Sequence, residues 1–419
     1  MKNRLSIKVS FVLALVTIFT LSLIGAGQTF AKNSDKTWSF GIISDTQWTK
    51  TDDGYNPNSI AAWIVKQIDQ KFIEAGVDLV IAVGDTVDCG DTDNIYVRAL
   101  YAQDLYNAGI GFYPLRGNHE AVSCSNPDSA AAMQYAFPQI GTGVNNETPA
   151  DITTALIFPA GDLLNNAPEV ATGEPFIVGT DFSQPQWVNH KEKSLSYAFQ
   201  YKNATFMMLD QFDVDGNYYN STIPEQMYWI DKTLSQRPKK SPAFVFVHKN
   251  ILGRNHKDSM FGGTITGADP GDGDGVDIDS LTPAQKADLD AKIYAETEFI
   301  ACMQDNEVPM VLSGHDHNHY YSLVTSPDGN SQVYQLITQS DSSKFYTPHA
   351  PDSSNEIAIE NDLYRVGYYI VKVDNKKVTI DYYADTTVAN PTQESDANYG
   401  VNGGTFNFEK LSTISYEMP

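Results

Sequence analysis

VDLVIAVGDTVD, residues 77–88, passes from an almost unbroken apolar run into a polar segment that contains Asp85 and Asp88. The apolar run, 77–84, is typical of a strand that is covered on both faces of a sheet. Segments with strand or helix patterns surround it, at 37–44, 56–76, 94–108 and 110–117. Their order is strand, helix, strand, helix, strand, which predicts an α/β unit.

The alternation stops at 121–193, where scattered Pro, Gly and Asn residues predict a long insertion with little regular structure. Further elements are predicted beyond it: a hairpin at 194–210, a helix at 223–237, a strand at 241–249, a helix at 283–306, a strand at 308–317, and hairpins at 320–339 and 365–385. The hairpins add antiparallel strands. The polar segment 387–419 has no clear pattern, and whether it folds back onto the rest stays open.

The N-terminal segment, residues 1–31, has the organisation of a secretory signal peptide. Three basic residues precede an uncharged apolar run, and small residues near its end offer a cleavage site before Lys32. An uncleaved membrane anchor is the alternative, since the apolar run approaches membrane-spanning length. Cleavage predicts a secreted or periplasmic protein without a stable membrane anchor.

The chain has 419 residues and a formal net charge of −24. Removing residues 1–31, which carry three basic and no acidic residues, lowers the charge to −27. Such an acidic surface argues against nucleic acid or an anionic membrane as a resident partner. An anionic substrate would therefore need a local positive centre. The oligomeric state stays open.

Three cysteines, Cys89, Cys124 and Cys302, allow one disulfide and one free thiol in an oxidising compartment. Cys302 lies in an apolar helical pattern and is predicted to be the buried free thiol. Cys89 and Cys124 follow the second and third predicted strands, so we predict that they form a disulfide. Two separate free cysteines are the alternative.

Polar residues follow five of the predicted strands. They are Asp45, Gln47, Asp85, Asp88, Asn118, His119, His248, His315 and His317. Taken singly, an Asp after a strand is more often a turn residue or a helix cap, and a lone His is more often structural. Because ligands bind outside the carboxyl ends of strands in open α/β sheets, five such strand ends together predict one common crevice.

The segments that carry these residues resemble, in the same order, the sequence blocks of the calcineurin-like metallophosphoesterase superfamily. The blocks are SDTQ (44–47), VGDTVD (83–88), RGNHE (116–120), FVHK (246–249) and SGHDH (313–317). The resemblance implies an α/β fold of two stacked mixed β-sheets flanked by helices, a four-layer sandwich with loop insertions. It also implies a catalytic domain over residues 32–386 and a C-terminal extension at 387–419.

The resemblance further implies a centre for two metal ions. One ion would be held by Asp45, Gln47, Asp85 and His317, and the other by Asp85, Asn118, His248 and His315, so that the Asp85 carboxylate bridges them. Mixed carboxylate, amide and imidazole ligands suit divalent or trivalent Mn, Fe or Zn better than Ca²⁺. Two such ions would supply the positive centre that an acidic protein otherwise lacks.

The implied function is that of a secreted metal-dependent phosphoric ester hydrolase, with a small phosphorylated monoester or diester as substrate. A metal-bound hydroxide would attack phosphorus, and His119, which matches the family's non-ligand histidine, would protonate the leaving group. Asp88 would either orient His119 or cap its loop. The alternative is a non-catalytic metal-binding or surface-interaction protein that retains the fold, but the presence of His119 favours the enzyme.

The sequence departs from the family pattern at two positions. Gln47 stands where the family usually has His, and its amide oxygen is a weaker donor, which would loosen one ion or change which metal is preferred. This departure is the best support for the non-catalytic alternative. Asn250 replaces the usual proline two residues after His248, which leaves the shape of that loop open.

The remaining histidines lie outside the ligand positions. His319 continues the run SGHDHNHY, and the family pattern predicts that it packs or hydrogen-bonds near the site without binding a metal. His190, His256 and His349 lie in polar loops and are predicted to be on the surface. A place over the site is the alternative for His256.

Overall fold

A computed structural model of the chain describes residues 37–47, 58–121, 129–137, 139–140, 175–186, 194–213, 220–256, 258–262, 281–348, 355–392 and 405–418. By its internal contacts the chain divides into Met1–Asp35, outside the described residues, and one unit, Lys36–Pro419. The predicted signal peptide, most of the predicted insertion, His190 and His349 also lie outside the described residues.

The first sheet has six strands in the order β14-β13-β12-β1-β2-β3. Its members are β1 (Thr37–Ile43), β2 (Leu79–Ala82), β3 (Gly111–Pro114), β12 (Gly367–Asp374), β13 (Lys377–Asp385) and β14 (Phe408–Glu417). β1, β2 and β3 are parallel, and β2 is buried along its whole length, as its apolar sequence predicts. The carboxyl ends of these three strands therefore lie at one edge of the sheet.

The second sheet has eight strands in the order β11-β9-β10-β8-β7-β6-β5-β4. Its members are β4 (Thr180–Ser183), β5 (Tyr197–Tyr201), β6 (Ala204–Leu209), β7 (Ala243–Val247), β8 (Met310–Ser313), β9 (His319–Thr325), β10 (Gln332–Ile337) and β11 (Glu356–Asp362). β6, β7, β8 and β10 are parallel, and the other strands pair antiparallel, so both sheets are mixed.

Aromatic side chains fill the space between the sheets. The ring of Phe40 on β1 lies 5.1 Å from that of Phe206 on β6 and 4.8 Å from that of Phe244 on β7, in edge-to-face contacts. On the outer side of the first sheet, Phe72 packs against Tyr368 of β12 at 5.2 Å. These contacts bury the apolar faces that the strand patterns require.

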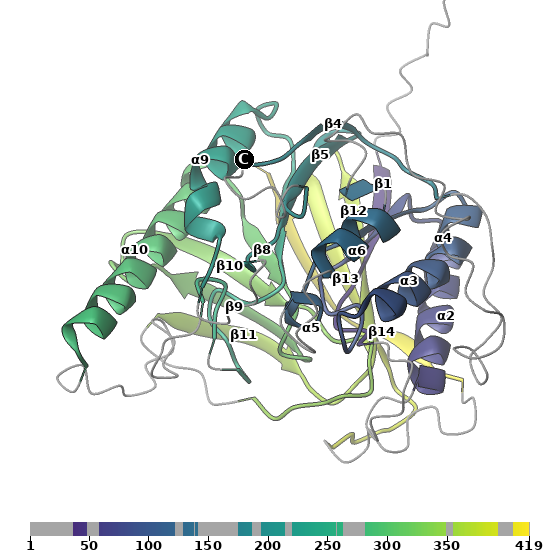
Figure 1. Cartoon of the computed structure of the whole chain (residues 1–419). Coiled ribbons are helices and arrows are strands. Elements are labelled where there is room, and N and C mark those ends of the chain that lie inside the picture. The colour runs from purple at the N-terminus through teal and green to yellow at the C-terminus, as the bar shows by residue number, and fades with distance from the viewer. Residues whose placement is uncertain are drawn as a thin grey trace, which may run out of the picture. The chain divides into compact units, whose positions relative to one another are not determined.

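Helices cover the outer faces of both sheets (Figure 1). They are α2 (Asn58–Ala75), α3 (Thr92–Tyr101), α4 (Gln103–Asn107), α5 (Asn118–Ala121), α6 (Ser129–Ala136), α9 (Ile223–Gln236) and α10 (Pro283–Asp305). α2, α3 and α4 lie on one side, and α9 and α10 form a second apolar cluster with β7 and β8 on the other. The order helix, sheet, sheet, helix confirms the predicted fold.

Local sequence signals account for the ends of the long helices. At the start of α10, the Thr282 side chain accepts a hydrogen bond from the backbone N–H of Gln285, and the Gln285 side chain accepts one from Thr282. α2 buries a face with four-residue spacing that ends at Phe72, and Gly76 follows with a φ of +65°, which only glycine adopts without strain.

The secondary structure differs from the sequence-based prediction in a few elements. The helix predicted at 94–108 is two helices, α3 and α4, which meet at Ala102. The strands β4, β11 and β14 were not predicted. They lie at sheet edges, where fewer apolar residues are needed because one side faces no neighbouring strand. β14 belongs to the segment 387–419 and pairs with β13.

The structure bears on two of the three cysteines. Cys302 on α10 is free and buried, which confirms its predicted state. Cys89 is disulfide-bonded. Its predicted partner, Cys124, lies outside the described residues.

No helix in the described part of the chain is long and apolar enough to cross a membrane.

Glu296 on α10 is a buried carboxyl group that makes the stability of the fold depend on pH. Neither of its carboxylate oxygens has a hydrogen-bond partner among the residues that the structure describes. Burial raises the pKa of Glu296 from 4.5 to about 8. Between these values the folded state holds a proton that the unfolded chain releases, so the free energy of unfolding falls as the pH rises from 4.5 to about 8.

We therefore expect Glu296→Gln to raise the free energy of unfolding at pH 8 by roughly 3 kcal/mol and to have much less effect at pH 5. Urea denaturation at both pH values measures this, with the exposed Glu298→Gln on the same helix as the control. A Glu296→Gln variant that is no more stable than the wild type at pH 8 would contradict the conclusion that the buried Glu296 has a raised pKa in the folded state.

Candidate metal centre

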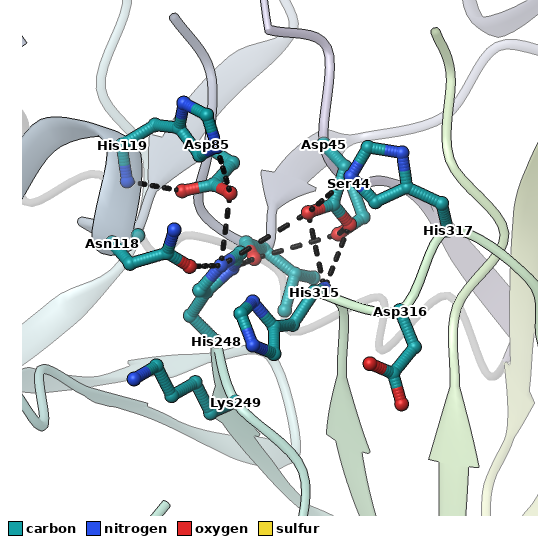
Figure 2. A network of polar contacts seen from close by, with 12 residues as sticks. Ser44, Asp45, Asp85, Asn118, His119, His248, Lys249, His315, Asp316 and His317 are labelled. Atoms are coloured by element: carbon teal, nitrogen blue, oxygen red, sulfur yellow. Dashed lines mark hydrogen bonds and ion pairs between the residues drawn. The ribbon is translucent and has the colours of Figure 1, made fainter. Parts of the chain in front are cut away.

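The predicted metal ligands lie together where β1, β2, β3, β7 and β8 end; Figure 2 shows all of them but Gln47, whose amide contacts Asp85. The residues are Asp45, Gln47, Asp85, Asn118, His248, His315 and His317. Each of them is buried, with at most 4% of its surface exposed. Strands from both sheets contribute, so the site exists only when the two sheets are stacked.

The backbone of most of these ligands is strained. Positive φ angles, between 46° and 72°, occur at Asp45, Gln47, Asp85, His315 and His317. For a residue other than glycine this conformation costs about 1 kcal/mol or more. Hydrogen bonds between loops maintain it: the N–H of Asp45 donates to the Gly84 carbonyl at 3.1 Å, and that of Gln47 donates to the Asp85 carbonyl at 2.8 Å. Strain of this kind concentrates at functional sites.

The first group of predicted ligands surrounds Asp45. Nε2 of His317 lies 3.6 Å from Oδ1 of Asp45. The Asp45 carboxylate also accepts the backbone N–H of His315, at 3.0 and 2.9 Å. Nε2 of Gln47 donates to Oδ2 of Asp85 at 3.4 Å. The Gln47 amide would have to rotate by about 180° to present its oxygen to a cation beside Asp85.

The second group surrounds His248. Asp85, His248 and His315 each offer a ligand atom, and these atoms lie within 4.8 Å of one another. Nε2 of His248 lies 3.2 Å from Oδ2 of Asp85 and 3.0 Å from Oδ1 of Asn118. It is also 4.0 Å from Oδ1 of Asp45. Asp85 is therefore within reach of both groups, as a bridging carboxylate must be.

Hydrogen bonds fix which ring nitrogen each histidine presents. Nδ1–H of His248 donates to the Val83 carbonyl, and Nδ1–H of His317 donates to the Lys344 carbonyl, both at 2.8 Å. Nε2 of His317, which faces Asp45, therefore keeps its lone pair. Burial lowers the pKa of His248, but the charges of Asp85 and Asp45 outweigh it and raise that pKa to about 9, so Nε2 of His248 carries a proton that a bound ion would have to displace. This arrangement, with a backbone acceptor behind the ring, is typical of metal-binding histidines.

The protonation of His315 and His317 also suits metal binding. Burial lowers the pKa of His315 to about 4 and that of His317 to about 3, so both rings are neutral at neutral pH, as a metal ligand must be. Burial, with the charge of Asp85, raises the pKa of Asp45 to about 8. Buried carboxylates of this kind need positive charge beside them. The donor set of two carboxylates, two amides and three imidazoles fits transition-metal ions.

His119 lies beside the donor set, in the first turn of α5. Its Nδ1–H donates to the Asp88 carbonyl at 2.6 Å, and its Nε2 lies 3.9 Å from Oδ2 of Asp85. The side chain is 24% exposed, unlike the predicted ligands. Of the two roles left open for Asp88, the structure supports the orienting one, through the carbonyl oxygen.

His319 belongs to the core and not to the donor set. Its ring stacks on Tyr382 at 4.3 Å, and its Nδ1 lies 2.9 Å from the hydroxyl of Tyr369. β8 ends at Ser313 and β9 begins at His319, and the positive φ angles in between break the extended geometry that would place all three histidines of SGHDHNHY on one face. The prediction that His319 packs without joining the ligands fits this geometry.

His256 is not a free surface residue, so that prediction was wrong. Its Nδ1 lies 3.0 Å from Oδ1 of Asp316, and its ring centre lies 4.1 Å from that of His315. The alternative, a place over the site, fits better. The sequence could not indicate this because the acceptor, Asp316, is 60 residues away along the chain.

Asn250, at the position of the usual proline, has a structural role that the sequence did not indicate. Its Nδ2 donates to Oδ2 of Asp316 at 2.7 Å, and its Oδ1 accepts the hydroxyl of Ser313 at 2.7 Å. Asp316 lies between the predicted ligands His315 and His317. Asn250 therefore ties the loop after His248 to the histidine segment, with bonds that proline has no side-chain groups to make.

Replacing Asn250 by alanine should lower the free energy of unfolding by about 1–3 kcal/mol, because the buried side chains of Asp316 and Ser313 would each lose a hydrogen-bond partner. We also expect metal affinity to fall by about 10–100-fold, as for other residues that hold metal ligands in place. Denaturant titration and equilibrium dialysis measure the two effects. Asn220→Ala, at an exposed asparagine, is the control, and a variant indistinguishable from it would contradict the bracing role.

Glu120 is a second residue whose role was missed, although the block RGNHE contains it. Its carboxylate accepts the backbone N–H groups of Asp85 at 3.1 Å, Val87 at 2.9 Å and Gly117 at 2.6 Å. It joins the loops that carry Asp85 and Asn118. These two loops lie so close together that a Cβ on Gly117 would be 2.1 Å from Oδ1 of Asp85, so only glycine fits at position 117.

The stacked mixed sheets, with carboxylates, amides and imidazoles gathered at their strand ends, define an α/β protein with a centre for metal ions. Residues 39–319 match the family model described as calcineurin-like phosphoesterase. The chain therefore belongs to the calcineurin-like phosphoesterase family, a class of metal-dependent phosphoric ester hydrolases. The predicted family and enzyme class are confirmed, and the family implies divalent metal ions and small phosphorylated substrates.

Solved structures similar to the chain include a purple acid phosphatase from yellow lupin (Lupinus luteus), with 12% identity and a TM-score of 0.49 over 91% of this chain and 54% of that one. The chain thus spans about half the length of the lupin protein. A dimetal phosphatase from Danio rerio has 12% identity and a TM-score of 0.41, over 82% of this chain and 95% of that one. No curated protein sequence matches the chain.

Proposed function

We propose that the protein is a secreted enzyme that hydrolyses small phosphate monoesters or diesters with the help of two transition-metal ions, Mn, Fe or Zn. The observation that carries this proposal is the position of His119. Its ring stands beside the bridging carboxylate of Asp85, outside both ligand groups and partly exposed. A site that only bound metal would have no need of a proton donor there.

The predicted ligands would divide between the two ions according to the two groups around Asp45 and His248. Asp45, Gln47, Asp85 and His317 would hold one ion, and Asp85, Asn118, His248 and His315 the other. When bound, the two ions would lower the pKa of water and stabilise negative charge on the phosphoryl oxygens. The hydrogen bonds at Nδ1 of His248 and His317 would keep these rings turned toward the ions.

His119 would supply the proton for the leaving group. The Asp88 carbonyl holds Nδ1, so the proton would pass from Nε2, the nitrogen on the side of Asp85. A leaving alkoxide receives that proton as its bond to phosphorus breaks, and this assistance matters most when the leaving group is a strong base.

A location outside the cytoplasm is part of the proposal. It is supported by the signal-peptide pattern of residues 1–31 and by the disulfide bond of Cys89, a linkage that persists in oxidising compartments. The acidic charge supports the absence of a resident nucleic acid. N-terminal sequencing of the exported protein should begin at Lys32; a mature chain that retains residues 1–31 would exclude this processing.

The test of the activity is reconstitution of the mature chain with Mn, Fe or Zn, followed by metal analysis and assays on an aryl phosphate monoester and the corresponding diester. We expect about two ions per chain and hydrolysis of at least one ester. Less than one ion per chain with no hydrolysis would reject the proposal. Two bound ions without turnover would favour the non-catalytic alternative.

A further inference from the structure

Lys344 contacts both sides of the candidate metal centre. It lies in the segment after β10, and its carbonyl oxygen accepts Nδ1–H of His317 at 2.8 Å. Its ammonium group lies 2.5 Å from Oδ1 of Asp88, in the loop beside His119, and its side chain is only 12% exposed. One residue therefore supports a predicted metal ligand through its main chain and the loop of the predicted proton donor through its side chain.

Asp88 offers His119 two acceptors. The carbonyl oxygen of Asp88 lies 2.6 Å from Nδ1 of His119, and the carboxylate oxygen Oδ1 lies 3.5 Å from the same atom. The ammonium of Lys344 is 2.5 Å from that carboxylate oxygen and so holds it. With the carboxylate held, the carbonyl is the nearer acceptor and determines the direction of the ring.

We propose that Lys344 is a positioning residue for His119. By holding the Asp88 carboxylate, it keeps Nδ1–H of His119 on the carbonyl and Nε2 on the side of Asp85. Without the ammonium group, a largely buried carboxylate would lack its cation, which is costly. That carboxylate would turn to accept Nδ1–H of His119, and the ring would rotate with it.

The main chain at Lys344 is anchored independently of its side chain. Upstream in the same segment, the hydroxyl of Ser340 donates to the Asp45 carbonyl at 3.0 Å, and the N–H of Asp341 donates to the Ser44 carbonyl at 2.9 Å. A side-chain substitution at Lys344 therefore keeps the carbonyl oxygen that holds His317. Metal binding and the position of His119 can thus be tested separately.

The experiment compares Lys344→Met with Lys344→Arg in the metal-loaded protein. The inference rests on the proposed function, so the kinetic readout is kcat/KM for an ester with a good leaving group, 4-nitrophenol, and one with a poor leaving group, an alkyl alcohol. We expect Lys344→Met to lose about tenfold on the alkyl ester and less than about threefold on the aryl ester, with unchanged metal content. Lys344→Arg, which keeps the charge, should recover most of the loss.

The double variant Asp88→Ala with Lys344→Met removes the side-chain oxygens that would capture His119. It should therefore restore most of the alkyl ester activity that Lys344→Met loses. Equal losses on both esters, or a Lys344→Arg variant as impaired as Lys344→Met, would overturn the proposal. Loss of metal in Lys344→Met would do the same, because it would place the role of the side chain at His317.

A crystal structure of Lys344→Met gives a readout that does not depend on turnover. We expect a carboxylate oxygen of Asp88 within hydrogen-bonding distance of Nδ1 of His119, in place of the carbonyl oxygen. An unchanged Asp88 and His119 would overturn the proposal even if the enzyme is active. An inactive wild type in which the variant shows the expected rotation would reject the proposed function and leave the positioning role supported.

Discussion

His317→Ala should lose one of the two metal ions and lower hydrolysis by more than about 100-fold. Removing residues that only support a metal ligand costs about 10–100-fold in affinity or activity, so removing the ligand itself should cost more. Nε2 of His317 faces Asp45 at 3.6 Å, and its Nδ1 is already bonded to the Lys344 carbonyl. No other described imidazole of the SGHDHNHY segment points at Asp45 to replace it. Metal analysis after dialysis measures the loss.

His319→Ala is the matched control, because it removes an imidazole two residues away. Its ring stacks on Tyr382 and bonds to Tyr369, so we expect the free energy of unfolding to fall by about 3 kcal/mol while metal content stays at the wild-type level. If His319→Ala lost metal as His317→Ala does, the first ligand group would be wrongly assigned, with His319 in the place of Gln47.

His119→Ala should keep both metal ions and lose about 10²- to 10⁴-fold in turnover on esters with poor leaving groups. The ring lies outside the donor set, and its Nε2 is 3.9 Å from the Asp85 carboxylate, so its removal leaves the predicted ligands in place. Esters of 4-nitrophenol need little protonation and should lose much less. A series of esters with leaving groups of increasing pKa measures the dependence.

The backbone N–H of His119 donates to Oδ1 of Asp85 at 2.8 Å, and this bond is kept in the alanine variant. Any loss of metal would therefore show that the side chain has a structural role that the contacts do not reveal. Equal losses across the series of esters would exclude proton donation by His119 as the reason for the defect.

Candidate residues of the site could be selected from the chain alone because each predicted ligand lies shortly after a strand whose apolar pattern is local. Asp85 follows the run 77–84, and Asn118 follows the strand that ends at Pro114. The parallel order of these strands brings such residues to one edge. The departure at Asn250, in contrast, was visible in the sequence, but its effect was not, because its acceptor, Asp316, comes close only when β7 pairs with β8.

The sequence by itself determined the α/β class, the order of most strands and helices, and the set of candidate ligands. The class and the order of elements depend on apolar periodicity, which neighbouring positions in the chain encode, and the set of candidate ligands follows from the resemblance of the strand-end segments to the blocks of the family. Edge strands such as β14 were not predicted from the sequence, since they bury little apolar surface. Their positions follow from pairing with a strand that is already in place.

Only the tertiary structure decided which residues support the predicted ligands and the predicted proton donor through hydrogen bonds and ion pairs. Asn250 meets Asp316 across 66 residues of chain, and Lys344 meets Asp88 across 256. It also decided which ring nitrogen His248 and His317 present, since their acceptors are carbonyl groups of distant segments. Such contacts have no local sequence signal, because a hydrogen bond depends on distance and direction in space. These distances and directions arise only when distant strands pair within the second sheet and the two sheets pack against each other.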